Sequence, residues 1–409
     1  MSWQTVPLVQ LAAPKAHAFV GGPFGSKLTS KDYVAEGIPV IRGTNLASGR
    51  YLNEQDFVFV SEEKLRKDLS TNVAHRGDVV FTQRGTLGQV SIIPENSNFD
   101  EYVISQSQMK LSVDAAKADS RFIYYWFSSR ETVEKISSRN SSSGVPHINL
   151  SVLRSFKVPV PPLTQQTRIA DILSTYDDLI ENNRRRIGLL EQTARMLYRE
   201  WFIHLRFPGH EHAKITNGLP EGWERLKLVD VVDLVKDNVL PANFAEDEIH
   251  IGLEHIPRRS FTLADWEPAE DLASGKTRFA EGDILFCKIR PYFHKVGFAL
   301  RSGLASSDAI VWRVKDPSDW PMVVCATSSD HFVAVASKTV KEGSKMPRAD
   351  LKVLHGYALL KPPEGLLGIF NDTILPITQQ CKALALANRA LAEARDLLLP
   401  RLMNGEIAV

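Results

Sequence analysis

The sequence lacks the features of a membrane protein or of an exported one. No run approaches the ~18 consecutive apolar residues of a membrane-spanning helix. The first five residues carry neither the basic flank nor the apolar stretch of a signal peptide. The three cysteines, Cys287, Cys325 and Cys381, lie too far apart for a local metal or redox motif. We therefore expect a cytoplasmic protein with reduced thiols and no membrane association.

Catalytic motifs are also missing. Residues 274–277 end like a phosphate-binding loop, but Glu270 stands where that motif needs a glycine. No G-x-S-x-G elbow and no Asn-Pro-Pro-Tyr tetrapeptide of amino-group methylation occurs. His210, Glu211 and His212 have no third ligand nearby, so we interpret them as loop residues. The sequence predicts no catalytic residue, no metal site and no cofactor in this chain.

The net charge of +1 does not by itself indicate a nucleic-acid-binding protein. Residues 1–163 hold 18 basic and 15 acidic side chains, whereas residues 208–376 hold 20 and 24. Within the second stretch, residues 276–301 carry six basic side chains and two acidic ones. A local basic strip of this kind is what attracts a phosphate backbone.

What the sequence does contain is an internal duplication. Residues 162–166 read Pro-Leu-Thr-Gln-Gln, and residues 376–380 read Pro-Ile-Thr-Gln-Gln, 214 positions later. Further matches join residues 77–81 to 282–286, 152–153 to 353–354, 161–162 to 362–363, and Gly144 and Pro146 to Gly343 and Pro347. The copies diverge in the loops between these anchors. This pattern indicates a common scaffold that carries two different specificities.

The first repeated phrase leads into a helix with an unbroken heptad pattern. Its seam alternates steps of four and three: Ile169, Leu173, Tyr176, Ile180, Asn183, Ile187, Leu190, Ala194, Leu197 and Trp201. Such a pattern predicts a coiled coil. Asn183 either fixes the register of the partner helix or lies at a local splay. Residues 184–186 are three arginines, which form a solvated face or contact DNA or a partner subunit.

A second helix is predicted to start at Pro376 and to kink or end at Pro400. Its predicted seam is Leu384, Ala387, Leu391, Ala394, Leu398, and then Arg401 or Leu402. Two heptad helices separated by a whole domain pack most simply as an antiparallel pair. We expect an α+β protein with a pseudo-twofold internal repeat. Its parts are a mixed α/β domain at 1–160, a coiled-coil helix at 161–207, a second mixed domain at 208–375 that opens with a linker at 208–219, and a helix at 376–409.

Strand-like runs in the first domain occur at residues 38–41, 56–60, 78–82, 89–93, 109–113 and 156–160. Several turns combine basic, aromatic, amide and small residues, which suits contacts to base edges and phosphates. The turns at 83–86 and 288–295 occupy matching places in the two copies, and a third turn spans residues 21–27. The predicted DNA-contacting residues are Lys27, Arg42, Gln83, Arg84, Thr86, Arg258, Arg259, Lys288, Arg290, Tyr292 and Lys295.

These anchors together resemble the specificity subunit of a Type I restriction-modification enzyme. Residues 161–166, followed by Ile169 and Leu173, are similar to the start of the family's central helix, and residues 197–202 to its end. Residues 219–223 resemble the start of a second target-recognition domain, and residues 398–407 resemble the C-terminal tail. Residues 22–28 with 37–40 are similar to the opening of a recognition domain. The likeness covers nearly the whole chain, although Gln165 and Gln379 stand where the family more often has glutamate.

The resemblance implies a non-catalytic protein that binds double-stranded DNA. Each target-recognition domain would read one half of a bipartite site, and the two helices would set the gap between the halves. Two methyltransferase subunits and restriction/translocase subunits would assemble around the chain. S-adenosylmethionine, ATP and Mg would be bound by those partners. Base-reading residues vary between members, so the residues proposed above rest on loop chemistry alone.

Two other classes of protein remain as alternatives. A two-domain adaptor that does not bind DNA would hold protein partners without needing basic loops. A free-standing nuclease would need a cluster of carboxylates with a lysine, for which Asp56, Glu62 and Lys64 are the nearest candidates.

Overall fold

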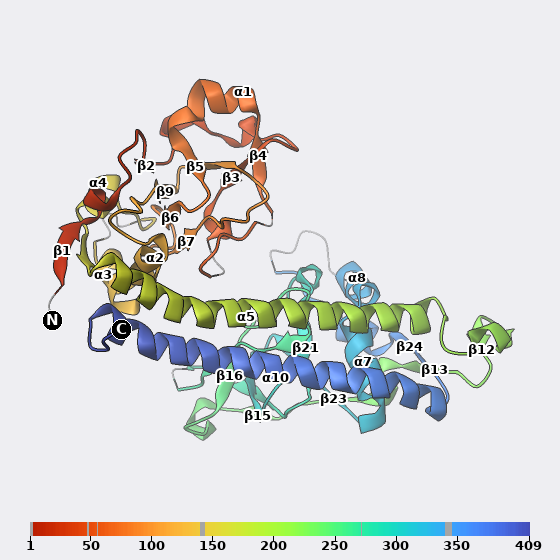
Figure 1. Cartoon of the computed structure of the whole chain (residues 1–409). Coiled ribbons are helices and arrows are strands. Elements are labelled where there is room, and N and C mark those ends of the chain that lie inside the picture. Colours follow the sequence, from red (N-terminus) through yellow and green to blue (C-terminus); the bar gives the residue numbers. More distant parts are fainter. Residues whose placement is uncertain (1–2, 47–48, 55, 140–143, 271, 340–345) are drawn as a thin grey trace. The chain divides into compact units, whose positions relative to one another are not determined.

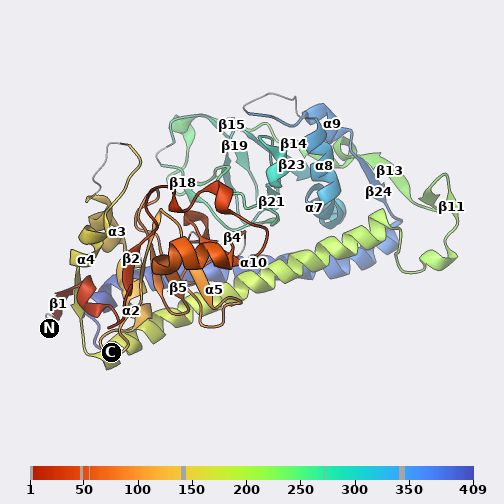
Figure 2. The same cartoon turned by 90° about the horizontal axis from the view of Figure 1, so that it is seen from above.

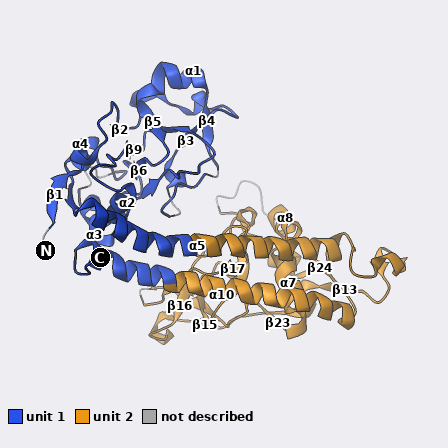
Figure 3. Ribbon diagram, viewed as in Figure 1, with its two compact units in different colours: residues 1–180, 391–409 blue, residues 181–390 orange. Residues whose placement is uncertain are grey.

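The computed structural model describes residues 3–46, 49–54, 56–139, 144–270, 272–339 and 346–409. The chain divides into unit 1, residues 1–180 and 391–409, and unit 2, residues 181–390 (Figure 3). Gly343, which the duplication pairs with Gly144, lies outside the described residues. Within the described ranges, no helix is both long and apolar enough to span a membrane.

Unit 1 contains two four-stranded sheets, with the orders β2-β9-β6-β7 and β4-β3-β8-β5, and a two-stranded pair of β1 and β10 (Figure 1). Its strands are β1 (Gln4–Pro7), β2 (Phe19–Gly21), β3 (Ile38–Ile41), β4 (Val58–Val60), β5 (Val73–His75), β6 (Val79–Thr82), β7 (Val90–Ile92), β8 (Glu101–Ile104), β9 (Gln108–Leu111) and β10 (Lys157–Val160). Its shorter α-helices are α1 (Glu62–Lys64), α2 (Ser120–Ser128), α3 (Arg130–Ser137) and α4 (Leu150–Ser155). All six strands predicted for this unit are confirmed.

Unit 2 contains two five-stranded sheets, with the orders β14-β23-β20-β21-β17 and β15-β19-β22-β16-β18, and the pairs β13-β24 and β11-β12. Its strands are β11 (Ile215–Thr216), β12 (Leu219–Pro220), β13 (Glu224–Lys227), β14 (Val232–Leu234), β15 (Asn238–Val239), β16 (Ile249–Ile251), β17 (Thr262–Leu263), β18 (Glu267–Pro268), β19 (Lys276–Phe279), β20 (Ile284–Cys287), β21 (Val296–Ala299), β22 (Gly303–Ala305), β23 (Ala309–Val314) and β24 (Ala358–Lys361). Its shorter α-helices are α6 (Leu228–Val231), α7 (Trp320–Thr327), α8 (Asp330–Lys338) and α9 (Leu351–His355). The three cysteines lie in this unit, and all three are free and buried.

The duplication is visible in how the strands pair. β3 pairs with β8 in parallel and with β4 antiparallel, and β16 pairs in the same way with β22 and β18. The central hairpin of β6 and β7, with β9 on its other side, recurs as β20, β21 and β23. The predicted repeat of two mixed domains is therefore confirmed at the level of strand order.

The sequence match between residues 77–81 and 282–286 has a structural cause. Gly77 and Gly282 both adopt a positive φ, of 79° and 84°, in the turn before the central strand. The next residue is a buried aspartate in both units, and each carboxylate accepts a backbone N–H three residues earlier. Asp78 also pairs with Lys110, and Asp283 with Arg313. A basic partner is what makes burial of such a carboxylate tolerable.

Two long helices contribute to both units. α5 (Leu163–Tyr198) continues into a π-helical turn at Arg199–Ile203, and α10 spans Glu364–Met403. They lie side by side and antiparallel in both views (Figures 1 and 2). In unit 2, Asn183 contacts Asn388, and Trp201 contacts Phe370. Trp201 follows Asn183 by 18 residues, whereas Phe370 precedes Asn388 by 18 residues, which is the pattern of an antiparallel pair. Every residue of the predicted α5 seam is buried or half-buried, which confirms that seam.

The predicted start of the second helix is wrong. α10 begins at Glu364, directly after Pro362 and Pro363, and runs through Pro376 and Pro400. A proline removes one helical hydrogen bond, but Phe370 and Ile374, on the turns before Pro376, are completely buried and stabilise the helix across it. The repeated five-residue phrase therefore opens α5 but lies inside α10.

The predicted seam of the second helix is wrong at two positions. Ala387 is exposed, whereas its neighbour Asn388 is half-buried and bonded to Asn183. Arg395, rather than Ala394, meets a residue of α5, because its guanidinium pairs with Asp177. The observed seam of α10 consists of Leu367, Phe370, Ile374, Ile377, Cys381, Leu384, Asn388, Leu391, Arg395, Leu398 and Leu402, which keeps steps of three and four throughout. Residues 184–186 on α5 are exposed.

Candidate nucleic-acid interface

The two matched turns are held by the same backbone contacts. In each unit, the turn after the central strand forms an isolated antiparallel bridge with the segment before a short helix: Arg84 with His147 in unit 1, and Ile289 with Arg348 in unit 2. Each bridge has two backbone hydrogen bonds: Gly85 N to Pro146 O, 2.9 Å, and Ile148 N to Gln83 O, 3.0 Å; Arg290 N to Pro347 O, 2.8 Å, and Ala349 N to Lys288 O, 2.8 Å. The equivalence predicted for these turns is therefore confirmed, and it fixes which residues correspond.

At single-residue resolution, Arg290 corresponds to Gly85 and not to Arg84. Gly85 has a φ of +104° and Arg290 a φ of +48°, so both turns place a left-handed residue at this point. Glycine adopts that conformation without cost, whereas arginine is strained there. Arg84 corresponds to Ile289, which is buried. Arg84 and Arg290 therefore occupy adjacent positions of the backbone framework that the two turns share.

Aromatic and basic side chains gather on the turn of unit 2. The guanidinium carbons of Arg258 and Arg290 lie 4.1 and 5.9 Å from the centre of the Phe293 ring. Tyr292 meets the same ring edge-on at 5.0 Å and is 54% exposed. Arginine planes and exposed aromatic rings are suited to base edges and phosphates.

Three further basic residues were predicted for unit 2, and each has a hydrogen-bond or ion-pair partner. The amine of Lys288 donates to Ser307 O at 2.7 Å, and that of Lys295 donates to Leu253 O. Arg259 pairs with Asp330 at 3.0 Å on the surface. Lys288 and Lys295 are half-buried, whereas Arg258, Arg259 and Arg290 are exposed. The arginines are therefore better placed than the lysines to contact a ligand.

Backbone strain concentrates at this turn. Arg259, Arg290 and His294 all have a positive φ, between 48° and 56°. Arg259 N donates to His294 O at 2.9 Å, so two of these residues are joined directly. The imidazole of His294 is buried and contacts Ser328 O at 2.9 Å, and burial lowers its pKa. Such conformations cost about 1–3 kcal/mol each and concentrate at functional sites.

In unit 1, three chain segments meet at the corresponding end of the sheet. The side-chain amide of Gln106 donates to Gly25 O at 2.6 Å and to Leu28 O at 3.0 Å. Gly22 N donates to Gln108 O at 2.8 Å, and Gln83 N donates to Ser107 O at 2.7 Å. The turn at 21–28 and the turn at 83–86 are thereby both tied to residues 105–108.

The predicted residues of unit 1 differ in how freely they face solvent. Lys27, Arg84 and Thr86 are exposed, and Gln83 is half-buried. Arg42 is also half-buried, and its guanidinium donates to Asp56 O at 2.7 Å. Lys27, Gln83, Arg84 and Thr86 are therefore the better candidates, whereas Arg42 acts within the fold.

The sequence prediction missed three residues of these turns. The side chain of Gln106 bonds to the turn at 21–28 of unit 1, and the guanidinium groups of Arg258 and Arg290 lie over the Phe293 ring in unit 2. Arg348 lies in the bridge opposite Ile289 and reaches Asp308 at 3.3 Å. The match of Pro146 with Pro347 was the available signal for Arg348, since each proline directly precedes the bridging residue.

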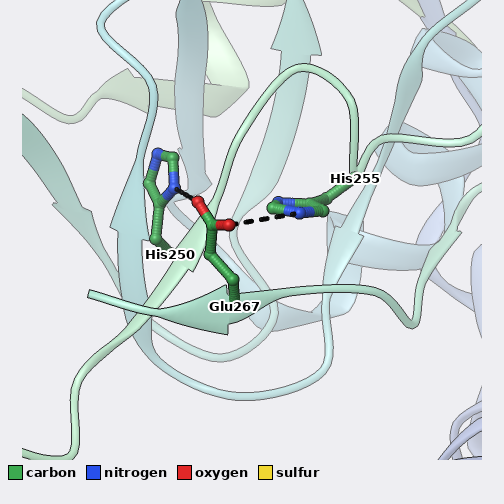
Figure 4. A group of neighbouring side chains, drawn as sticks. All are labelled: His250, His255 and Glu267. Atoms are coloured by element: carbon green, nitrogen blue, oxygen red, sulfur yellow. Dashed lines mark hydrogen bonds and ion pairs between the residues drawn. The ribbon is translucent and has the colours of Figure 1, made fainter. Parts of the chain in front are cut away.

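Within the described ranges, His250, His255 and Glu267 form a group with metal-ligand chemistry, and their ligand atoms lie within 4.8 Å of one another (Figure 4). His250 Nδ1 lies 2.9 Å from a Glu267 oxygen. Gly252 N donates to His255 Nδ1 at 2.9 Å, so Nδ1 is an acceptor and the N–H of the ring is on Nε2, the nitrogen that faces Glu267. A metal on that nitrogen would have to displace the proton. We therefore interpret the group as a hydrogen-bonded brace between β16 and β18.

These features define a class of protein: two similar mixed α/β units, each presenting a basic turn on a shared framework, together with an antiparallel helix pair. The family described as the Type I restriction modification DNA specificity domain matches residues 24–192. The specificity subunit of the Type I restriction enzyme MjaIX from Methanocaldococcus jannaschii is 23% identical, over 93% of this chain and 89% of its own length. That of HindI from Haemophilus influenzae is 21% identical, over 81% and 87%. Over most of its length, this chain is therefore similar to the specificity subunits of Type I restriction enzymes.

A solved structure has the same fold. The S subunit of the Type I restriction-modification system from M. genitalium aligns with a TM-score of 0.57 over 98% of this chain and 96% of its own, at 14% identity. This likeness agrees with the predicted arrangement of two mixed domains and two long helices.

Proposed function

We propose that this chain is the DNA-recognition subunit of a Type I restriction-modification complex. Unit 1 reads one half of a bipartite double-stranded site, and unit 2 reads the other. The paired helices α5 and α10 set the gap between the halves. The chain supplies specificity, and the reactions take place on partner subunits.

The observation that carries this proposal is the matched pair of turns. Residues 83–86 and 288–291 are each joined to the segment opposite by two backbone hydrogen bonds, in the same register. These four bonds can persist when the side chains of the turns change, because none of the four uses a side chain. Two recognition sites with different side chains on one scaffold are what a bipartite and asymmetric DNA sequence requires.

The same proposal assigns the remaining parts of the reaction. Methyltransferase subunits bring S-adenosylmethionine, and restriction/translocase subunits bring ATP and Mg. The weak net charge of +1 suits this division, because partner subunits share the contacts to phosphate. The proposed base-contacting residues are Lys27, Gln83, Arg84 and Thr86 in unit 1, and Arg258, Arg259, Arg290 and Tyr292 in unit 2.

The test is methylation of a randomised DNA library by the chain assembled with its methyltransferase. Arg84→Ala should relax base preference in one half-site only, and Arg290→Ala in the other. Each should cost about 1–3 kcal/mol of specific binding. The charge-matched controls are Arg66→Ala in unit 1 and Arg225→Ala in unit 2, two exposed arginines outside the turns. Unchanged half-site preferences in both turn variants would refute the assignment.

A further inference from the structure

A buried carboxylate on α5 holds the chain segment that carries Arg258 and Arg259. Glu191 is 2% exposed, and one of its oxygens accepts four hydrogen bonds. The donors are Ser260 Oγ at 2.8 Å, Phe261 N at 3.1 Å, Thr262 N at 3.0 Å and Thr262 Oγ1 at 2.7 Å. A buried charge with this many donors fixes the backbone that surrounds it.

Arg195, one helical turn further along α5, extends this hold to Arg259 itself. Its guanidinium donates to Arg259 O at 2.8 Å and lies 3.5 Å from the second oxygen of Glu191. It also lies over the Phe261 ring at 5.2 Å. Arg259 is one of the residues with a positive φ, 56°, so its strained backbone is held on the carbonyl side by Arg195 and on the amide side by His294 O.

Unit 1 ties the corresponding segment to a carboxylate of the same helix, through a long side chain that comes from the segment itself. Arg50 O accepts from Ile92 N at 2.8 Å, just as Phe261 O accepts from Phe298 N at 2.8 Å. The buried guanidinium of Arg50 reaches down to Asp178 of α5. In each unit, therefore, a charged group fastens this edge of the sheet to α5.

Building on the proposed function, we infer that Glu191 and Arg195 are positioning residues for recognition of the second half-site. They set the conformation of residues 258–262 and so aim Arg258 and Arg259 at the DNA. The helix that spaces the units would then also take part in sequence reading, without touching the DNA at these two residues.

A double-mutant cycle tests this inference in the complex with the methyltransferase. The three proteins are Glu191→Ala, the pair Arg258→Ala with Arg259→Ala, and all three changes together. We expect Glu191→Ala to weaken specific binding about tenfold. The plot of log affinity against log salt should also become less steep by about one to two, one for each phosphate that an arginine no longer neutralises. In the combined variant it should cause no additional weakening, because it acts through the arginines.

Three more variants separate positioning from general stability. Glu191→Gln should restore binding, since its side-chain oxygen can accept the same four hydrogen bonds. Glu181→Ala, on an exposed carboxylate of the same helix, controls for the change in charge. If Glu191→Ala does not fold, Arg195→Met leaves the four hydrogen bonds of Glu191 in place, removes the bond to Arg259 O together with the contacts to Glu191 and the Phe261 ring, and should reduce the steepness of the same salt dependence.

The outcomes distinguish this inference from the proposed function. If the arginine pair can be removed with no effect on DNA binding, the assignment of this turn to DNA is wrong. If the arginines matter but Glu191→Ala binds like the wild type, or its effect adds in full to theirs, only the positioning role is overturned.

Discussion

Asn183 donates its side-chain amide to the side-chain oxygen of Asn388 at 2.9 Å, across the seam between α5 and α10. The sequence left open whether Asn183 fixes a register or lies at a splay. The contact supports the first interpretation, because a buried amide finds its partner in only one alignment of the two helices.

The asparagine pair should cost stability in exchange for that specificity. Asn183→Leu alone leaves Asn388 without its partner and should destabilise the protein by about 1–3 kcal/mol. Asn183→Leu combined with Asn388→Leu should be at least as stable as the wild type. Thermal unfolding measures both, and Ala387→Leu, on the exposed neighbour, should be nearly neutral. A double variant less stable than either single one would contradict this account.

The helix pair should act as a ruler. We would insert a copy of residues 181–187, with its three arginines changed to glutamine, before Glu181, and a copy of residues 384–390 after Ala390. Both insertions fall at the boundary between units and keep every contact within each unit. One heptad adds about 10.5 Å, so the preferred DNA gap should grow by roughly three base pairs at 3.4 Å per pair. Methylation of a library of gap lengths provides the readout.

Helical phase gives this experiment an internal control. Three base pairs rotate the duplex by about 100°, so the one-heptad variant should lose affinity. Inserting three heptads in each helix lengthens the preferred gap by roughly nine base pairs, close to the ~10.5 base pairs of a full turn of the duplex. That variant should recover part of the lost affinity. Insertion into α5 alone should abolish binding by breaking the seam. An unchanged optimum at full activity in the matched variants would refute the ruler.

A charged network in unit 1 should be sensitive to removal of a single member. Asp177 accepts from the Tyr125 hydroxyl at 2.6 Å and pairs with Arg395 of α10. Arg395→Met leaves that carboxylate without its cation, and breaking such a mostly buried pair costs about 3–5 kcal/mol when burial is complete. Replacing both residues by leucine should recover most of that stability. Denaturant unfolding of the full chain, monitored by hydrogen exchange in unit 1, distinguishes the two variants.

The two units should respond to acid at different pH values. Burial lowers the pKa of His250, His294 and His355, all in unit 2. At a pH between the lowered pKa of each histidine and its ordinary pKa of ~6.5, the unfolded chain binds more protons than the folded chain. Unit 2 should therefore lose stability as the pH falls below about 6.5, by at most ~1.4 kcal/mol per pH unit for each histidine.

In unit 1, ion pairs and hydrogen bonds lower the pKa of Asp32 to about 2 and also lower that of Asp68 and Asp114. Their stabilisation persists above the unfolded value of ~3.9 and is lost below it. Hydrogen exchange from pH 7.5 to pH 4 should show unit 2 opening first. His250→Gln should reduce the pH dependence of unit 2. Simultaneous opening of both units would contradict the prediction.

Much of this architecture is readable from local patterns. The strands of unit 1, the α5 seam and the equivalence of the two turns follow from residue types that repeat along the chain. The errors occurred where a distant partner decides the outcome. Asn388 and Arg395 occupy seam positions because Asn183 and Asp177 face them, and the pattern of α10 alone favours the neighbouring alanines.

The start of α10 and the role of Glu191 were hidden for the same reason. Pro376 indicates the start of a helix unless the burial of Phe370 and Ile374 is known. Glu191 is an ordinary helical glutamate until strand β17, about 70 positions later, places its amides against it. The left-handed conformation of Arg290 likewise depends on its hydrogen bond to Pro347 O.

The boundary of unit 2 has a genetic consequence. Residues 181–390 form one uninterrupted stretch of the gene, yet this stretch contains a complete recognition unit together with its own share of both helices. Under the proposed function, replacement of this one stretch by recombination on both sides of it would exchange one half of the target and bring in a matched seam. A change of gap length, in contrast, needs two coordinated insertions some 210 codons apart. Inherited variation in target sequence should therefore arise more readily than variation in spacing.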